Sequence, residues 1–533
     1  MPNTNLLLEN GLIYTLNPAQ PRVTSAAIRG NRFVYLGQGE KARQIFCGEP
    51  ADIVDLKGAT VLPGLTDAHL HFEWYSTGLL AINAEQPSAE NVIREVRQRA
   101  ETLPAGKWIT GYGWNHNVWG NGAFPTAAML DRVAPHHPVA LVAKSAHASW
   151  VNSTALRLAG ITDDTPDPAG GQIVRDASGK ATGILLEEAI KLVEKIIPPI
   201  APEDLVKAVK QGMQNANRMG LTGIHDMDQP SVFRAFQQLH KECSLTLRVT
   251  KNIPLTFLDS AIAAGLCTGF GDDMLHLGAV KMFADGALGP KTAWMLAGYD
   301  SAPQDTGIST TDIEILCDSV LKANANGLAA AIHAIGDRAN REILNIYSEA
   351  KKSHPGTGLR NRIEHVQLLA PEDTARLAEL GVVASMQPIH ATSDMYIADE
   401  HWGSRINGAY AWKTQLDNGA VLAFGSDCPV ETMDPLTGIH AAVTRRRADG
   451  TPGPEGWHPE QRLSIEDAVR AYTQGPAFAT GMEDRLGTLA PGYLADMTIL
   501  DRDIFSIDPM DILHTTVLGT IVDGKFVWRS NQL

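Results

Sequence analysis

The sequence predicts an α/β protein built on a closed barrel of parallel strands, with a small β-domain formed by the two ends of the chain. Three observations support this prediction. Helical stretches that end in glycine are followed repeatedly by short apolar strands in the middle of the chain. β-prone runs with tight-turn signals stand at both ends. The chain has 533 residues, 44% of them hydrophobic and 20% charged, which is ordinary for one large globular domain with attachments.

The two ends of the chain are similar in character. Apolar, β-prone residues occupy 6–14 and 26–36, with Asn10-Gly11 and Gly30-Asn31 as tight-turn signals. Residues 496–501 and 519–528 repeat this pattern, with Asp523-Gly524 as the turn. Neither end can bury a sheet face alone, so we expect the terminal strands to pair into one β-domain.

The middle of the chain alternates predicted helices and strands. A helix over 202–219 closes at Gly220 before a strand over 221–225, and a helix over 371–380 closes at Gly381 before 382–386. A helix over 311–326, with a capping box at Thr311 and Glu314, precedes Gly327 and a strand over 328–333, and Gly419 precedes a strand over 420–424. The number of these units suits a closed barrel better than an open sheet.

One stretch of the middle departs from this pattern. About 74–220 is too long for one strand–helix unit and holds five of the ten tryptophans, so we expect an inserted subdomain that overhangs the barrel mouth. The predicted domains are therefore residues 1–60 and 484–533 for the two parts of the β-domain and 61–483 for the barrel with its insertion.

Charge, cysteine content and hydropathy indicate which partners and which cellular compartment to expect. The net charge is -15, and the one dense basic run, Arg445-Arg446-Arg447, is too short for a nucleic-acid partner. Five cysteines without a C-x-x-C spacing favour a reducing compartment. The first residues show no signal peptide, and no apolar stretch approaches the ~20 residues of a membrane helix. We expect a cytoplasmic enzyme with a small-molecule substrate and no membrane partner; the sequence leaves open whether it forms a homo-oligomer.

The strongest chemical signal is His69-Leu70-His71. Residues two apart in a strand face the same side, so both imidazoles can hold one divalent metal. Taken alone, the pair is equally consistent with structural histidines. However, His333, His365 and Asp427 also end predicted strands, where barrel enzymes carry their chemistry. Convergence of four separated strands on one site favours a metal centre.

These residues lie in motifs that resemble a known family. The chain is similar to the amidohydrolase superfamily, in particular to its family 3, the YtcJ-like branch that includes N-substituted formamide deformylase. The resemblance spans nearly the whole chain and implies a distorted TIM (β/α)8 barrel with a β-sandwich made from both termini. The motifs that carry it are Asp67-Ala68-His69-Leu70-His71, residues 148–153, 281–289 and 333–337, Arg362-Ile363-Glu364-His365, Gly425-Ser426-Asp427 and residues 487–496.

The resemblance also implies roles for individual residues. His69 and His71 would bind one metal ion, and His333 and His365 a second. Asp427 would bind metal and act as the base for the attacking water. Lys281 matches the position of a carboxylated lysine that bridges two metals; an unmodified lysine beside a single metal is the alternative. The implied cofactors are two divalent ions, with zinc expected.

Further polar and aromatic residues are candidates for supporting roles. Asp67 would orient a metal-binding histidine, and Glu364, as the strand neighbour of His365, should point away from the metal. Asp285 either caps a turn or touches substrate. Residues considered for substrate binding are His147, His390, Trp119 and Trp294, although a structural role is equally open for the histidines.

The expected activity is hydrolysis of a non-peptide carbon–nitrogen bond, in an N-acyl or N-formyl compound, by metal-activated hydroxide. A deaminase on this fold is one alternative. Such enzymes commonly have a glutamate a few residues after the strand-five histidine, and residues 333–337 contain none, which disfavours this alternative. A lactonase, esterase or phosphotriesterase uses the same kind of metal site and stays an alternative. A metal-binding regulatory protein without turnover is a further alternative, which the complete ligand set disfavours.

Overall fold

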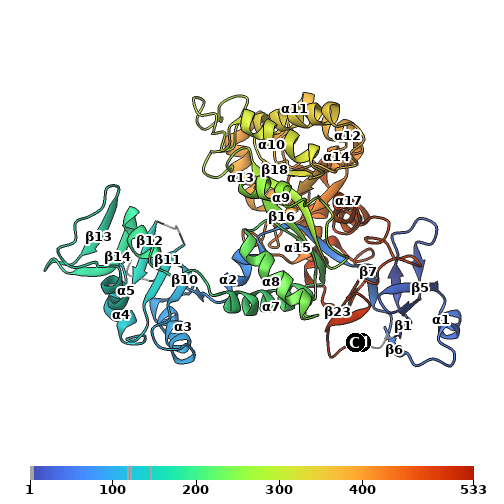
Figure 1. Cartoon of the computed structure of the whole chain (residues 1–533), viewed down its shortest axis with the longest axis horizontal. Helices are drawn as coiled ribbons and strands as arrows, with labels where there is room; N and C mark the ends of the chain where they lie inside the picture. Colours follow the sequence, from blue (N-terminus) through green and yellow to red (C-terminus); the bar gives the residue numbers. More distant parts are fainter. Residues whose placement is uncertain (1–4, 117–118, 120–122, 145–146) are drawn as a thin grey trace. The chain divides into compact units, whose positions relative to one another are not determined.

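The computed structural model describes residues 5–116, 119, 123–144 and 147–533. The chain divides into two compact units (Figure 1): residues 1–74 with 209–533, and residues 75–208. The second unit corresponds to the stretch expected as an insertion over about 74–220.

The first unit contains a parallel barrel of eight strands. Each strand pairs in parallel with the next, in the order β8, β15, β16, β17, β18, β19, β20 and β21. The first and last strands meet through backbone hydrogen bonds just beyond β21, from Asp427 N to His69 O (2.7 Å) and from His71 N to Cys428 O (2.8 Å). The predicted α/β barrel is therefore confirmed. The strands are Leu65–Leu70, Leu221–Asp226, Arg248–Pro254, Leu275–Phe283, Ala330–Ala334, Arg362–His365, Val383–Met386 and Leu422–Phe424.

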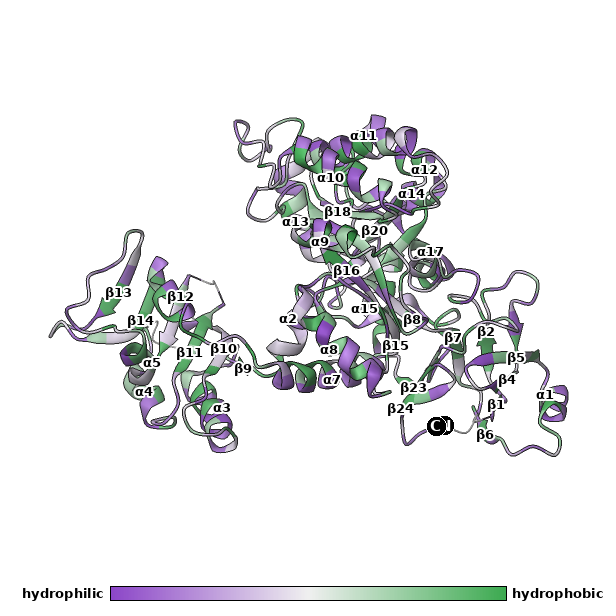
Figure 2. Cartoon of the chain, in the orientation of Figure 1, coloured by the Kyte–Doolittle hydropathy of each residue, from purple (hydrophilic) through white to green (hydrophobic). Residues whose placement is uncertain are grey.

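Helices follow most of these strands and return the chain to the start of the next one. Their polar outer and apolar inner faces show as mixed purple and green on α7, α8 and α11 (Figure 2), as expected for helices that pack one face on a sheet. The helices of this unit include α7 (Pro202–Arg218, entering from the second unit), α8 (Pro230–Lys241), α9 (Leu258–Ala263), α10 (Ile313–Ala325), α11 (Asp337–Ser353), α12 (Arg376–Leu380), α13 (Pro388–Trp402), α14 (Trp412–Asp417), α15 (Pro435–Thr444), α16 (Ile465–Ala471) and α17 (Gln474–Ala479).

Two helix predictions need correction. The cap of α10 is Asp312, whose side chain accepts a hydrogen bond from Glu314 N at 2.8 Å, and not Thr311. The predicted helix over 371–380 is divided into a 3-10 turn, Pro371–Asp373, and α12. Gly381 ends α12 with φ 72°, as the glycine stop predicted.

Strands from both termini form the β-sandwich in the first unit. One sheet has the order β5-β4-β1-β6, and the other has the order β24-β23-β22-β7-β2-β3. Their facing side chains, among them Leu8, Ile28, Val61, Met497 and Ile521, form one buried core. The strands are Asn5–Glu9, Leu12–Tyr14, Arg22–Val23, Ser25–Arg29, Arg32–Gly37, Asp52–Asp55, Thr60–Pro63, Met497–Leu500, Val517–Val522 and Lys525–Arg529, for β1 to β7 and β22 to β24.

The second unit has its own sheet, in the order β13-β14-β12-β11-β10-β9, covered by α3 (Ala89–Thr102), α4 (Ala127–Asp131) and α5 (Ser153–Leu158). Trp114 and Trp150 are buried in its core, and Trp119 packs against them. The strands are Gly171–Arg175, Ala181–Glu187, Ala148–Val151, Val139–Ala143, Ile109–Trp114 and Ile82–Asn83. Across the described residues of both units, every helix is too short or too polar to cross a bilayer.

Candidate metal centre

His69 and His71 stand at the C-terminal end of β8 with matching environments. His69 Nδ1 lies 2.6 Å from Glu364 Oε2, and His71 Nδ1 lies 2.8 Å from Asp228 Oδ1. The other ring nitrogen of each histidine, Nε2, lies 3.4 Å from Asp427 Oδ1. Each carboxylate partner therefore fixes its ring with Nε2 directed to one common point.

Asp427 follows β21 in a left-handed backbone conformation, with φ 60°. Such a conformation is uncommon outside glycine and marks positions where the surrounding structure imposes a special direction. Burial alone would raise the pKa of Asp427, but the imidazoles of His69 and His71 hold it well below its ordinary value. A carboxylate is therefore present at neutral pH.

A second group of donors lies on the other side of Asp427. Ligand atoms of His365, His390 and Asp427 all lie within 4.8 Å of one another, as do those of His69, His71 and Asp427. His365 ends β19 with φ 78°, and its Nδ1 lies 2.8 Å from Gln387 Oε1. Burial holds the pKa of His365 well below its ordinary value, so the ring is in the neutral form that binds metal.

His333 and Lys281 border this second group. The ring centroid of His333 lies 4.5 Å from that of His365, while His333 Nε2 lies 2.9 Å from the carbonyl oxygen of Gly286. Burial lowers the pKa of His333 to about 3 and that of Lys281 to about 8. Lys281 Nζ is buried without a hydrogen-bond partner among the described residues and lies 4.8 Å from the centre of the Phe283 ring.

These donors fit a divalent cation. Imidazole and carboxylate donors of one tetrahedral zinc ion, at about 2.0–2.2 Å from it, lie about 3.3–3.6 Å apart. The 3.4 Å separations around Asp427 Oδ1 match this spacing. His69 Nε2 is buried and has no hydrogen-bond partner within the described part of the chain, which is explained if a cation occupies that position.

Glu364 contacts the site directly, and the expectation that it points away from the metal is wrong. Arg362 and Glu364 share one side of β19, and Arg362 donates hydrogen bonds to both carboxylate oxygens of Glu364. His365 leaves the alternation because of its positive φ, so it can reach the centre from the next position in the chain. Although burial opposes it, Arg362 and His69 hold the pKa of Glu364 well below its ordinary value.

Asp67 holds backbone rather than a histidine ring, whereas Asp285 holds backbone and also lies beside a ring, with its Oδ1 3.5 Å from His333 Nε2. Asp67 accepts hydrogen bonds from the backbone of His69 and Ser426 and from the Ser426 hydroxyl, so it joins β8 to the segment after β21. Asp285 accepts hydrogen bonds from the backbone N–H groups of Trp294, Ile335 and Gly336, at 2.8–3.0 Å. Of the two roles considered for Asp285, the contacts support the turn cap.

The four predicted substrate residues fall in different places. His390, on α13, lies in the second donor group. Trp294 follows β17 and stacks under the guanidinium of Arg338, 4.5 Å from the ring centre. Trp119 and His147 belong to the second unit, where Trp119 Nε1 donates to Gln86 O and His147 Nδ1 lies 2.9 Å from Glu187 Oε2. Substrate contact stays a prediction for all four.

Further residues that orient the histidines were not predicted from the sequence. Asp228 lies two residues after β15, Gln387 follows β20 directly, and Arg362 begins β19. The rule that selected the metal ligands, a polar residue at the C-terminal end of a barrel strand, also selects Asp228 and Gln387. Arg362 escapes this rule because it begins β19, although its partner Glu364 is only two residues away.

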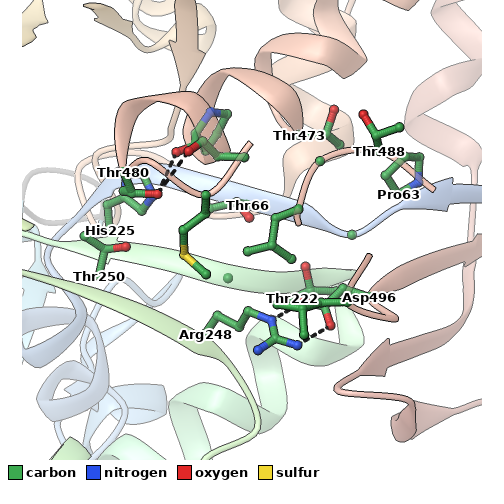
Figure 3. A pocket seen from close by; sticks show the side chains of 18 of the residues that line it. Pro63, Thr66, Thr222, His225, Arg248, Thr250, Thr473, Thr480, Thr488 and Asp496 are labelled. Carbon is green, nitrogen blue, oxygen red and sulfur yellow. Dashed lines mark hydrogen bonds and ion pairs between the residues drawn. The ribbon is translucent and has the colours of Figure 1, made fainter. Parts of the chain in front are cut away.

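A cavity at the opposite end of the barrel is lined by residues from the starts of the strands. Figure 3 shows Thr66, Thr222 and Thr250 around it, with Arg248 paired to Asp496. Its free space of about 30 Å³ holds about one water molecule and cannot accept a substrate. The candidate site is therefore the C-terminal end, where the histidines meet.

The chain is similar to known proteins over nearly its whole length. The sequence model of the family described as "Amidohydrolase family" matches residues 52–528. The putative amidohydrolase YtcJ of Bacillus subtilis is 32% identical, over 98% of this chain and 99% of that protein, and N-substituted formamide deformylase of Arthrobacter pascens is 26% identical, over 98% and 97%. The crystal structure of an uncharacterized metal-dependent hydrolase from Pyrococcus horikoshii matches with a TM-score of 0.79 and 30% identity, over 95% of this chain and 99% of that one.

Proposed function

Since the chain belongs to the amidohydrolase family, we propose that it is a metal-dependent hydrolase that cleaves a non-peptide carbon–nitrogen bond in an N-acyl or N-formyl compound. One observation carries the proposal: two groups of histidines, one with His69 and His71 and the other with His365 and His390, meet at a single buried carboxylate, Asp427. Zinc is the proposed metal, because neutral imidazole and carboxylate donors suit it.

Asp427 is the proposed proton carrier. A divalent cation held by the histidines supplies Lewis acidity toward water and toward the substrate carbonyl. Asp427 accepts one proton from the attacking water and returns it to the departing amine nitrogen as the carbon–nitrogen bond breaks. The products are a carboxylic acid, which is formic acid for an N-formyl substrate, and an amine.

The surroundings of the ligands support an apolar group on the substrate. Phe283 is 45% exposed although its ring centroid lies 5.4 Å from that of His333. Val430, three residues after Asp427, is 55% exposed. Large apolar side chains exposed beside a polar centre mark a binding surface. The substituent on the nitrogen or on the acyl carbon is proposed to lie against them.

A hydrolysis screen tests the proposal. Purified protein, metal-loaded and metal-depleted, would be assayed on N-formyl and N-acyl amines, N-acyl amino acids, lactones and aminopurines. Metal-dependent release of amine from the amides is expected. Turnover of lactones or aminopurines in preference to every amide would favour an esterase-type enzyme or a deaminase, and metal-dependent turnover of none would favour the regulatory alternative.

A further inference from the structure

His390 has features that a substrate contact does not explain. It lies in the first turn of α13, directly after barrel strand β20, and is 7% exposed. Its Nε2 atom is buried and finds no hydrogen-bond partner among the described residues. A buried nitrogen without a partner is unfavourable, so Nε2 is available to a group that the protein itself does not supply.

The direction of Nε2 identifies the kind of partner. His390 Nε2 lies 3.7 Å from Asp427 Oδ2, while Oδ1 of the same carboxylate faces His69 and His71. One oxygen of Asp427 therefore faces His69 and His71, and the other faces His390. A position between His390, His365 and Asp427 is bounded by two imidazoles and a carboxylate, which is a set of donors that a divalent transition metal prefers.

His365 and His390 are held in the same way. Their rings are nearly parallel, with an interplanar angle of 13° and centroids 5.9 Å apart. The Nδ1 atom of His365 contacts Gln387, and that of His390 lies 3.3 Å from the side-chain amide nitrogen of Gln367. The Gln367 amide oxygen is itself buried and unpaired within the described residues. Turning that amide by 180° lets the oxygen accept Nδ1–H, which leaves the lone pair of His390 on Nε2.

We infer that His390 is a metal ligand, which holds the second divalent ion together with His365 and Asp427. The inference rests on the proposed function, because it assumes the metal centre, but it assigns His390 to the ion and not to the substrate. His333 then lies next to this ion, and its Nε2 is 2.9 Å from the carbonyl oxygen of Gly286.

Cobalt titration of the metal-depleted full-length protein tests the assignment. Co²⁺ binding would be followed by calorimetry and visible absorption for the wild type and for His390→Gln. The wild type should bind two ions. His390→Gln should bind the first with unchanged affinity and the second at least ~10-fold more weakly, since loss of even an outer support of a ligand weakens binding 10–100-fold.

His401→Gln is the matched control. His401 is a second buried histidine on α13, but its Nδ1 contacts Ser301 Oγ at 2.8 Å. Both cobalt affinities should be unchanged in this variant. His390→Asp supplies a carboxylate oxygen in place of the imidazole nitrogen and should recover part of the second affinity. It replaces His390→Gln as the deciding variant if the latter does not fold.

The possible outcomes separate the two proposals. Two cobalt ions bound by His390→Gln with wild-type affinities would overturn the inference, and a higher KM in the same variant would return His390 to substrate binding. A wild-type protein that binds no cobalt would instead contradict the proposed function, before any variant is compared.

Discussion

At the scale of single residues, the centre depends on the orientation of each imidazole. His69, His71 and His365 each have Nδ1 against a side-chain oxygen, from Glu364, Asp228 and Gln387 respectively. Such partners fix which nitrogen carries the proton and which one faces the ion. The sequence could predict the histidines from their places at strand ends. It could not predict that Glu364 supports His69, because the positive φ of His365 breaks the strand alternation on which that prediction relied.

Asp427→Asn should separate proton transfer from binding. The amide keeps the size of the side chain but cannot accept a proton from water, so kcat should fall by at least ~10²-fold. Steady-state kinetics on a substrate found in the screen, with metal content measured alongside, checks this. A variant with near-normal kcat would remove Asp427 from the proton-transfer step.

Lys281 is the second residue whose chemistry can be tested directly. Its buried Nζ has no hydrogen-bond partner in the described structure, and a neutral amine can combine with CO2 to give a carbamate and a proton. Carbamate oxygens would attract cations that an ammonium group repels. Lys281→Ala should therefore lose one metal ion and most activity, and added acetate or propionate should restore part of both.

Carboxylation of Lys281 can be checked directly in the electron density of a crystal grown with metal and bicarbonate. An unmodified amine in such a crystal would contradict carboxylation, and full metal content in Lys281→Ala would show that the ions do not need this residue.

At the scale of elements, the segment that closes the barrel also carries metal ligands. The segment after β21 bonds to β8 through Asp427 N and His71 N, and Asp67 ties it further through Ser426. Most strands and glycine helix stops could be predicted from periodicity. The pairing of strands was harder to predict. Asn10-Gly11 joins β1 to β2, which lie in different sheets, so a tight-turn signal does not determine which strands pair. Gly30-Asn31 and Asp523-Gly524 join antiparallel neighbours, as such turns commonly do.

Gly425→Ala tests this closure. An added Cβ would lie 2.5 Å from His69 N and 2.7 Å from Asp67 Oδ1, so β8 and the end of β21 would have to separate. Overpacking of this kind destabilises a protein by about 1–3 kcal/mol. We expect a lower Tm and weaker metal binding together.

Gly78→Ala is the control for Gly425→Ala, because no atom lies within 4 Å of its added Cβ. It should leave metal binding unchanged. Unchanged Tm and metal affinity in Gly425→Ala would show that the two segments are not held as closely as the structure indicates.

At the scale of the whole molecule, the β-sandwich is joined to the bottom of the barrel. Arg248, the first residue of β16, donates to both carboxylate oxygens of Asp496, at 2.6 and 2.8 Å, and both residues are buried. The sequence could predict a terminal β-domain, since neither end can bury a sheet face alone. It could not predict this ion pair, whose partners are 248 residues apart.

Asp496→Ala should therefore destabilise the protein strongly. Removing one partner of a buried pair costs about 3–5 kcal/mol when the other charge is left unpaired, and the loss here is at most that much because Arg248 Nη2 keeps Asp523 Oδ1 at 3.2 Å. Thermal or denaturant unfolding measures this loss, with Arg29→Ala, which removes one partner of an exposed pair with Glu49, as the control that should change stability by less than about 1 kcal/mol. Equal effects of the two substitutions would contradict a buried link between sandwich and barrel.

The most direct test of the metal centre is the metal content of the intact protein. Elemental analysis of gently purified wild-type chain should give about two divalent ions per chain, following the two-metal pattern. The double variant His69→Ala, His71→Ala should retain about one, because the group around His365 is left in place. A wild-type protein that hydrolyses its substrate at full rate with one ion, or with none, would contradict the two-ion centre.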